Sequence, residues 1–378
     1  MAPVYHPREM ALREPDKPAL IMVDQGAMIT YGELVRRADQ AAALFASLGI
    51  GAGDTIAILI ENHVGYPELI WGAKNSGIRY VTVSTHLNAA DAAYVIGDSG
   101  AKLLVTSRKQ ATLAGEAVVL IASKPLLLMM DGIVARFQPY EALLERQPAV
   151  PPQGRKRGPS MLYSSGTTGR PKGVRTEFPD APPEVPPQRL YMLLEQYAFD
   201  SDTVFVNPGP FYHAAPQRIM MTIHRTGGTV IGFQAFDPAA TLDAIGRFGA
   251  THGFFVPTMF RRMLALPDDV RRAARTGTMR HAIHGALSDP AETSDDRLVG
   301  ADDLGALRRY RSLWTYLHHF AGMAGASRLG RPARLQLHAA DYRVRWQRSS
   351  RRRAGPDHDE ERDECRLPRR CCQDGNAL

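Results

Sequence analysis

The sequence predicts an α/β fold with mostly parallel sheets, and two observations support this. Short apolar strands alternate with helical periodicity over roughly the first 290 residues, which is the pattern of repeated βαβ units. The 378 residues are 44% hydrophobic and 22% charged, which is typical of a soluble globular protein with room for two to three domains. We therefore expect a large α/β domain in the first part of the chain.

The elements before residue 160 follow from capping residues and apolar spacing. Thr30 is a plausible N-cap for a helix over 31–48, which three glycines then end, Gly49, Gly51 and Gly53. The further predictions are strands at 55–60, 80–83, 103–106 and 126–129, helices at 66–76 and 89–98, and a basic linker over 151–158.

The alternation continues beyond residue 176. A proline-rich surface loop is predicted over 177–189, and a helix over 190–197. Strands are predicted at 203–206, 229–231, 252–259 and 279–283, with helices at 220–225, at 238–248 and from 260 onward. Pro238 lies in the first turn of its helix, where proline is well tolerated.

The most informative stretch is 161–174, MLYSSGTTGRPKGV. An apolar strand end runs into hydroxyl side chains, glycines and one lysine. Glycines allow backbone amides to turn towards one point and bind an anion, and a lysine adds a positive charge suited to phosphate. The candidate phosphate-binding residues are Ser164, Ser165, Gly166, Thr167, Thr168, Gly169 and Lys172.

Two other interpretations of this stretch are disfavoured. The common phosphate loop needs a helix directly after its lysine, but Pro171 and Gly173 flank Lys172 and prevent a helix there. A flexible Gly/Ser/Thr linker is disfavoured by the preceding strand and by the proline–lysine pair. The stretch instead resembles the signature of the AMP-forming, adenylate-producing enzymes, which include acyl-CoA synthetases, luciferases and peptide-synthetase adenylation domains.

Weaker similarities lie on both sides of the signature. ITYGEL at 29–34, GDTIA at 53–57 and VPTM at 256–259 each resemble segments of acyl-CoA synthetases in the expected order. The resemblance covers about residues 10–288. It implies an incomplete N-terminal domain of the adenylate-forming fold over 1–290, with the small C-terminal domain absent.

The resemblance also implies an acyl and adenylate pocket. An aromatic–histidine segment of the family corresponds to Phe211, Tyr212 and His213, of which His213 would lie near the carboxylate being activated. A small-residue step that approaches adenine and the acyl group corresponds to His284, Gly285 and Ala286. Without the resemblance, a turn histidine such as His213 is more often structural.

The family implies a reaction and its partners. An AMP-forming acid–CoA ligase activates a fatty or aromatic acid with ATP and Mg²⁺ as an acyl-adenylate, which then passes to CoA. No catalytic residue and no metal ligand of the protein are assigned. The alternative is a catalytically inactive nucleotide-binding fragment. A luciferase-like or amino-acid-activating role stays open, although 205–216 offers no acidic partner for an amino group.

Beyond residue 290 the composition changes. From Arg297 onward there are 17 arginines, no lysine and 10 acidic residues, so this part alone accounts for the net charge of +7. The family's YGxTE segment, ribose-binding aspartate and C-terminal lysine are absent, and no lysine follows Lys172. Codons compatible with this part, read in the next frame, permit YGGTE. We therefore expect 291–378 to be a frameshifted or disordered Arg-rich tail.

The sequence disfavours nucleic-acid binding and zinc binding, and it favours a cytoplasmic location. Arginines near Tyr342 and Trp346 could contact nucleic acid, but a solvated tail is the simpler interpretation, so no nucleic-acid partner is expected. Cys365, Cys371 and Cys372 lack the paired spacing of a zinc site. With no apolar signal segment at the start and no stretch long enough to span a bilayer, we expect a cytoplasmic enzyme without transmembrane segments.

Overall fold

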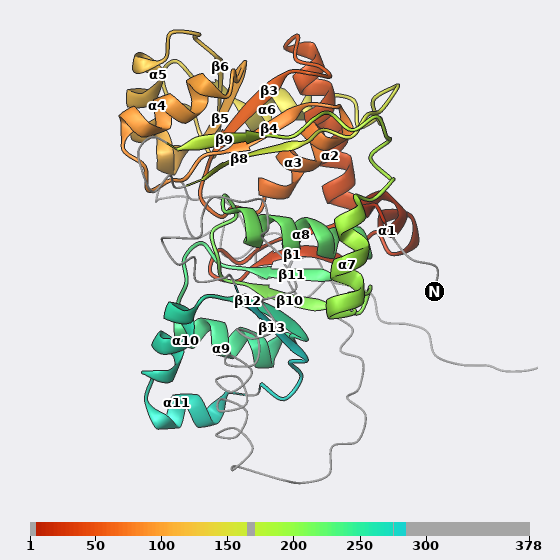
Figure 1. The fold of residues 1–378 in the computed structure, drawn as a ribbon, viewed down its shortest axis with the longest axis vertical. Coiled ribbons are helices and arrows are strands. Elements are labelled where there is room, and N and C mark those ends of the chain that lie inside the picture. Colours follow the sequence, from red (N-terminus) through yellow and green to blue (C-terminus); the bar gives the residue numbers. More distant parts are fainter. Residues whose placement is uncertain (1–4, 165–170, 275, 285–378) are drawn as a thin grey trace, which may run out of the picture.

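The structure, a computed structural model, describes residues 5–164, 171–274 and 276–284. Two sheets with helices between and around them make up this part of the chain (Figure 1). The chain starts in one sheet, builds the whole of the other, and then returns to complete the first.

The seven-stranded sheet comes from the middle of the described chain and has the order β7-β6-β5-β3-β4-β8-β9. Its pairs are parallel except for the antiparallel hairpin β8–β9 at one edge. The strands are β3 (Thr55–Leu59), β4 (Arg79–Thr82), β5 (Leu103–Ser107), β6 (Leu126–Met130), β7 (Gln138–Pro139), β8 (Ser160–Ser164) and β9 (Lys172–Arg175).

The six-stranded sheet joins the start of the chain to its later part, in the order β13-β12-β10-β11-β1-β2. β1 lies parallel to β11, with Leu20 opposite Val230, and only the β1–β2 pair is antiparallel. The strands are β1 (Pro18–Met22), β2 (Ala27–Thr30), β10 (Val204–Asn207), β11 (Thr229–Gly232), β12 (His252–Phe255) and β13 (His281–His284).

Helices form three layers around these sheets (Figure 1). The largest core cluster lies between the sheets and joins side chains of α2, α3 and α8 to both of them. Separate clusters bury α4 and α5 on the outer face of the seven-stranded sheet, and α9 and α10 on that of the six-stranded sheet. The helices are α1 (Pro7–Arg13), α2 (Tyr31–Ser47), α3 (Tyr66–Asn75), α4 (Ala89–Asp98), α5 (Ala111–Leu120), α6 (Tyr140–Glu145), α7 (Gln188–Tyr197), α8 (Ala214–Thr226), α9 (Pro238–Arg247), α10 (Pro257–Leu264) and α11 (Asp268–Ala273).

The α/β class and the mostly parallel sheets are confirmed, and so are the main elements before residue 160. Thr30 caps α2 through a capping box, because its side chain accepts from the Glu33 amide while the Glu33 carboxylate accepts from the Thr30 amide. The helix predicted at 89–98 has those same bounds in α4. This agreement is local: each element carries its own cap and its own apolar stripe.

Two predicted helix starts are wrong. α8 begins at Ala214 rather than at residue 220, because Pro216 is tolerated in a first turn, where its missing N–H has no partner to lose. The same reason applies to α10, which begins at Pro257 rather than at residue 260. The sequence analysis also missed α1, the β1–β2 hairpin, α5, β7 and α6.

Candidate functional site

The candidate site lies where the carboxyl ends of strands from the two sheets meet. Ligands of open parallel sheets bind outside the carboxyl ends of the strands. Thr82, the last residue of β4, donates from Oγ1 to the backbone oxygen of Tyr212, which follows β10 in the other sheet, at 2.8 Å. β4 is also the parallel neighbour of β8. The end of the signature strand and the segment after β10 therefore meet at one junction.

The signature stretch forms the hairpin β8–β9, in which Ser164 stands opposite Lys172. No helix follows the lysine, as the sequence predicts, and Lys172 is exposed at the start of β9. Ser165, Gly166, Thr167, Thr168 and Gly169 lie outside the described residues, as does the side chain of Ser164. Their role in phosphate binding stays a prediction.

Gly173 also has a packing role in the hairpin. It lies in the extended strand β9 and pairs with Tyr163. A Cβ atom at Gly173 would be 2.3 Å from Cε of Met161 and 3.0 Å from the hydroxyl oxygen of Tyr163. This glycine therefore permits close packing across the hairpin.

Helix α4 anchors the hairpin through its last residue. The Tyr163 hydroxyl donates to Oδ2 of Asp98 at 2.6 Å, and Arg175 donates to the Asp98 backbone oxygen at 2.9 Å. Burial, together with the bond to Asp98, raises the pKa of the Tyr163 hydroxyl, which therefore stays a neutral donor. The strands flanking the signature turn are thus fixed to the sheet.

The segment 209–213, which we call the aromatic segment, joins β10 to α8. Phe211 is fully buried, with its ring centroid 5.6 Å from that of Tyr66, and Tyr212 is 7% exposed. Tyr212 also lies edge-on to His86 at 6.3 Å and close to His213 at 4.7 Å. The predicted residues Phe211, Tyr212 and His213 therefore lie together, with the two aromatic rings packed inward.

His213 occupies the N-cap position of α8 and is exposed. Its pKa is lowered, first by partial desolvation of the ring and then by repulsion from His86. A lowered pKa keeps the imidazole mostly neutral at pH 7, so one ring nitrogen can donate a hydrogen bond and the other can accept one. His213 can therefore orient a carboxylate or phosphate oxygen without carrying a full charge.

The last predicted site residues lie at the end of the described chain. The backbone of His284 ends β13, which runs parallel to β12 with His284 opposite Phe255. The His284 side chain and residues Gly285 and Ala286 lie outside the described residues. The chain thus leaves β13 at the carboxyl end of the six-stranded sheet, and the role of these three residues stays a prediction.

Four residues at the junction escaped the sequence analysis: Asn62, Thr82, His86 and Gln217. Only the first three have a sequence signal that could have indicated them, namely a polar residue at or just after a buried strand. Asn62 and Thr82 are polar and lie at or just after buried parallel strands, and His86 follows β4 within a few residues. Gln217 lies in the first turn of α8, and its helical position gives no such signal.

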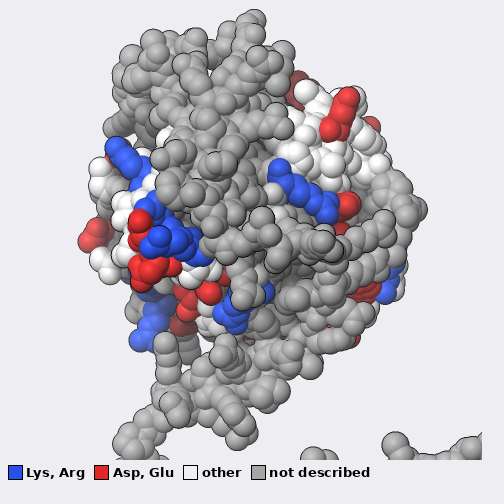
Figure 2. Space-filling view, turned by 90° about the horizontal axis from the view of Figure 1, so that it is seen from below, with Lys and Arg blue, Asp and Glu red and all other residues white. Residues whose placement is uncertain are grey.

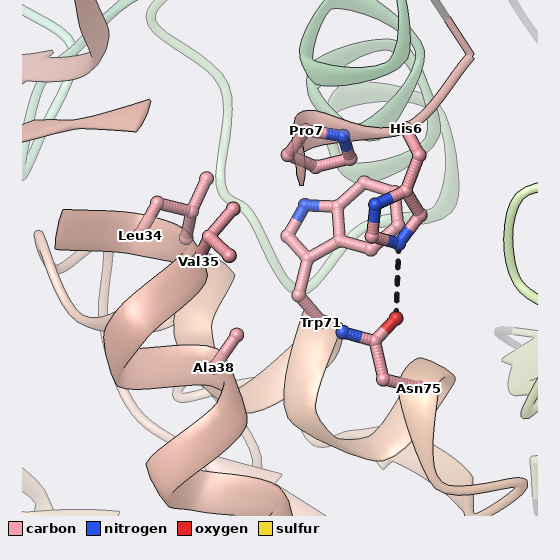
Figure 3. Close-up of a pocket in the computed structure, with 7 residues that line it drawn as sticks. All are labelled: His6, Pro7, Leu34, Val35, Ala38, Trp71 and Asn75. Atoms are coloured by element: carbon pink, nitrogen blue, oxygen red, sulfur yellow. Dashed lines mark hydrogen bonds between the residues drawn. The ribbon is translucent and has the colours of Figure 1, made fainter. Parts of the chain in front are cut away.

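A small pocket lies elsewhere, between α1, α2 and α3. It is lined by His6, Pro7, Leu34, Val35, Ala38, Trp71 and Asn75 (Figure 3). Inside it Nε2 of His6 and Oδ1 of Asn75 are hydrogen-bonded at 3.0 Å, and burial lowers the pKa of His6 to about 3. The pocket adjoins Asn75 at the C-terminal end of α3, whereas Tyr66 at the other end of that helix contacts Phe211, so the pocket is separate from the candidate site.

Other classes of site find little support in the described part of the chain. None of these residues forms a group of three or more His, Cys, Asp or Glu side chains that could hold a metal ion. Lysine and arginine side chains lie beside acidic ones on the face shown in Figure 2, which does not favour a uniformly basic surface. Among the described helices, none is long and apolar enough to cross a membrane.

Comparison with known proteins agrees with this geometry. The sequence matches the family described as AMP-binding enzyme over residues 8–330. It is 29% identical over 268 residues to a feruloyl-CoA synthase of Amycolatopsis sp, covering 71% of this chain and 51% of that protein. It is 25% identical over 272 residues to the long-chain-fatty-acid–CoA ligase FadD13 of Mycobacterium tuberculosis, covering 69% and 51%.

Solved structures show the same architecture. The N-terminal domain of FACL13 from Mycobacterium tuberculosis superposes with a TM-score of 0.63 at 23% identity, covering 74% of this chain and 68% of that one. A long-chain-fatty-acid CoA ligase from Rhodopseudomonas palustris gives 0.64 at 20% identity, covering 75% and 69%. The chain spans about half the length of the curated relatives it matches. By sequence and by fold, this chain belongs to the family of AMP-binding enzymes.

Proposed function

We propose that the chain is an AMP-forming ligase that joins a fatty or aromatic carboxylic acid to CoA. One observation carries the proposal: the strands of the signature hairpin, with Ser164 opposite Lys172, border the junction that holds Phe211, Tyr212 and His213. A phosphate-binding turn and an acid-binding wall would then lie at the same edge. The names of the relatives, a feruloyl-CoA synthase and a long-chain-fatty-acid ligase, supply the two classes of acid.

The reaction would proceed in two steps. The acid's carboxylate oxygen attacks the α-phosphorus of ATP, and the bond to the β-phosphate oxygen breaks and releases pyrophosphate. The CoA thiol then attacks the acyl carbon, and AMP leaves. Lys172 and the signature hydroxyls would offset negative charge on the phosphates, and His213 would orient the acid.

Mg²⁺ enters this proposal only with ATP. The described residues offer no cluster of carboxylates, histidines or cysteines for a resident metal. The ion would therefore arrive bound to the phosphate oxygens, which are its preferred ligands. It would neutralise charge on the leaving pyrophosphate.

A second candidate is a nucleotide-binding protein without turnover. It is the alternative that the sequence leaves open, because a phosphate-binding stretch by itself implies nucleotide binding and not turnover. Such a protein would bind AMP or an acyl-adenylate through the signature hairpin and the aromatic segment. It would not release pyrophosphate.

One pair of measurements separates the candidates. Pyrophosphate release is followed with ATP and Mg²⁺, with octanoate or a cinnamate and without acid, and AMP binding is followed by calorimetry. Acid-dependent release supports the ligase, whereas binding without release supports the second candidate. If neither pyrophosphate release nor AMP binding is observed, both candidates are contradicted. The same binding measurement on Lys172→Ala tests whether this lysine contacts the phosphates. Lys156→Ala is its control, since Lys156 is an exposed lysine paired with Asp180 outside the hairpin.

A further inference from the structure

The buried side chain of Asn62 connects the two sheets at the candidate site. Asn62 follows β3 of the seven-stranded sheet and is 3% exposed. Its Nδ2 donates to the backbone oxygens of Gly209 at 2.9 Å and Phe233 at 2.8 Å. Its Oδ1 accepts from the backbone amide of Phe211 at 2.6 Å. All three partners lie just beyond the carboxyl ends of β10 and β11 in the other sheet.

Asn62 is itself held in place. Its backbone oxygen accepts a hydrogen bond from Gln25, in the turn between β1 and β2, at 3.1 Å. The side chain uses both amide donors and one acceptor position, which leaves little freedom to rotate. Aspartate at this position would lose both donors, and leucine would fill the volume with no hydrogen bond at all.

The aromatic segment depends on this contact for its backbone position. Two further bonds hold it: Gln217 donates to the Phe211 oxygen at 3.2 Å, and Thr82 donates to the Tyr212 oxygen. Gln217 belongs to the helix that the segment leads into, so it moves with the segment. Asn62 and Thr82 therefore provide the side-chain hydrogen bonds that tie it to the seven-stranded sheet, among the described residues.

We propose that Asn62 is a positioning residue that fixes Phe211, Tyr212 and His213 relative to the signature hairpin. It does so by clamping the backbone at Gly209 and Phe211 from its position just after β3, a strand of the sheet that carries the hairpin. This role of Asn62 rests on the proposed function, because the ligand measurements below assume that the site binds an acyl-adenylate. A shift of the segment by an ångström would separate the acid-binding wall from the phosphate-binding turn.

The chain offers a matched control for a purely structural role. Asn75 lies at the C-terminal end of α3, whereas Asn62 precedes the start of that helix. The two are similarly buried, with Asn75 2% exposed and Asn62 3% exposed. Its side chain bonds His6 of the N-terminal helix region instead of the other sheet. Asn75→Leu therefore removes a buried asparagine of the same layer without touching the aromatic segment.

The first measurement needs no ligand. The pKa of His213 is followed by NMR in the full chain, in Asn62→Leu and in Asn75→Leu. Asn62 carries no charge, so it can change this pKa only by moving the segment or its exposure. We expect the pKa to rise towards 6.5 in Asn62→Leu and to stay lowered in Asn75→Leu. Equal responses of the two variants, or no response of Asn62→Leu, would overturn the proposal.

The second measurement uses ligands. Binding of AMP and of non-hydrolysable octanoyl- and benzoyl-sulfamoyl adenosine is measured by calorimetry. We expect Asn62→Leu to weaken the acyl analogues at least tenfold and AMP much less, and Asn75→Leu to leave all of them unchanged. Wild-type protein that binds no analogue contradicts the proposed function, and the His213 titration still decides the role of Asn62.

A milder substitution covers the case in which Asn62→Leu does not fold. Thr82→Val removes only the bond to the Tyr212 oxygen and keeps the shape of the side chain. We expect it to shift the His213 pKa in the same direction and by a smaller amount. An unchanged His213 pKa in Thr82→Val, with the pKa also unchanged in the neutral variant Asn62→Ala, would show that the segment is held without these bonds.

Discussion

The signature hairpin and the aromatic segment border the same junction, but solvent reaches them very differently. In the hairpin Lys172 is exposed and Val174 is 46% exposed, whereas Phe211 is fully buried and Tyr212 nearly so. The hairpin is an antiparallel edge of its sheet, and the aromatic segment follows a strand with neighbours on both sides. Charge for a phosphate must stay accessible, whereas a wall for an apolar acid gains from being packed.

This contrast predicts that one half of the site tolerates substitution and the other does not. Changes in the aromatic segment and its supports should reduce the free energy of unfolding. Changes in the hairpin should reduce ligand affinity at nearly constant stability. The predictions below test this division, beginning with the largest expected loss of stability.

Acid should destabilise the packed core through three buried histidines that lie outside the aromatic segment. Burial lowers the pKa of His6 to about 3 and the pKa values of His224 and His252 to about 4. Unfolded histidines titrate near 6.5, so the unfolded state binds more protons and stability falls as pH drops from 6.5 towards 4. Each pKa unit corresponds to about 1.4 kcal/mol, so we expect this acid-dependent loss to be the largest of the predicted effects.

The check is urea unfolding between pH 7.5 and 4. His63 opposes the trend above pH 6.5: although burial lowers its pKa, its contact with Asp131 at 3.2 Å raises the pKa overall. The pair therefore becomes more stabilising as pH falls through the raised pKa and is fully stabilising below the unfolded value of 6.5. His224→Gln should flatten the acid loss, and His63→Gln should steepen it. A stability that does not change down to pH 4.5 would contradict the neutral, buried state of these rings.

Phe211→Ala should give the largest loss from a single side chain. The ring is fully buried against Tyr66, and removing it leaves a cavity between the sheets. Such truncations cost about 3–5 kcal/mol. Urea unfolding measures the loss, and Leu12→Ala is the control, since Leu12 is 82% exposed. A loss below 1 kcal/mol would mean that the segment is not part of the core.

Lys172→Ala should have the smallest effect on stability and a clear effect on binding. An exposed lysine contributes within about 0.5 kcal/mol to folding. Loss of its charge should weaken binding of ATP and AMP about tenfold and reduce the salt dependence of that binding. Calorimetry at two salt concentrations tests this. Unchanged affinity would remove Lys172 from the phosphate site and leave the hydroxyls of the turn to be tested.

The sequence predicted the local part of the fold and missed the part that depends on distant partners. The capping box at Thr30 and the helix at 89–98 are encoded within a few residues, and both are confirmed. The β1–β2 hairpin is also local, since two short apolar runs flank a turn at Gly26, and the sequence analysis overlooked it. The sequence could not show that β1 lies beside β11, some 200 residues away in the chain.

The same division holds for the candidate site. The signature pattern by itself predicted a phosphate-binding stretch and indicated the family, and its proline and glycine excluded a helix after Lys172, as β9 confirms. The hydrogen bonds that hold the aromatic segment could not be predicted from the sequence. Asn62 contacts Gly209, Phe211 and Phe233 only because two sheets built from separate parts of the chain bring their carboxyl ends together. The sequence determines which side chains are present and what chemistry they offer, but contacts between residues more than a hundred positions apart form only when the sheets pack together.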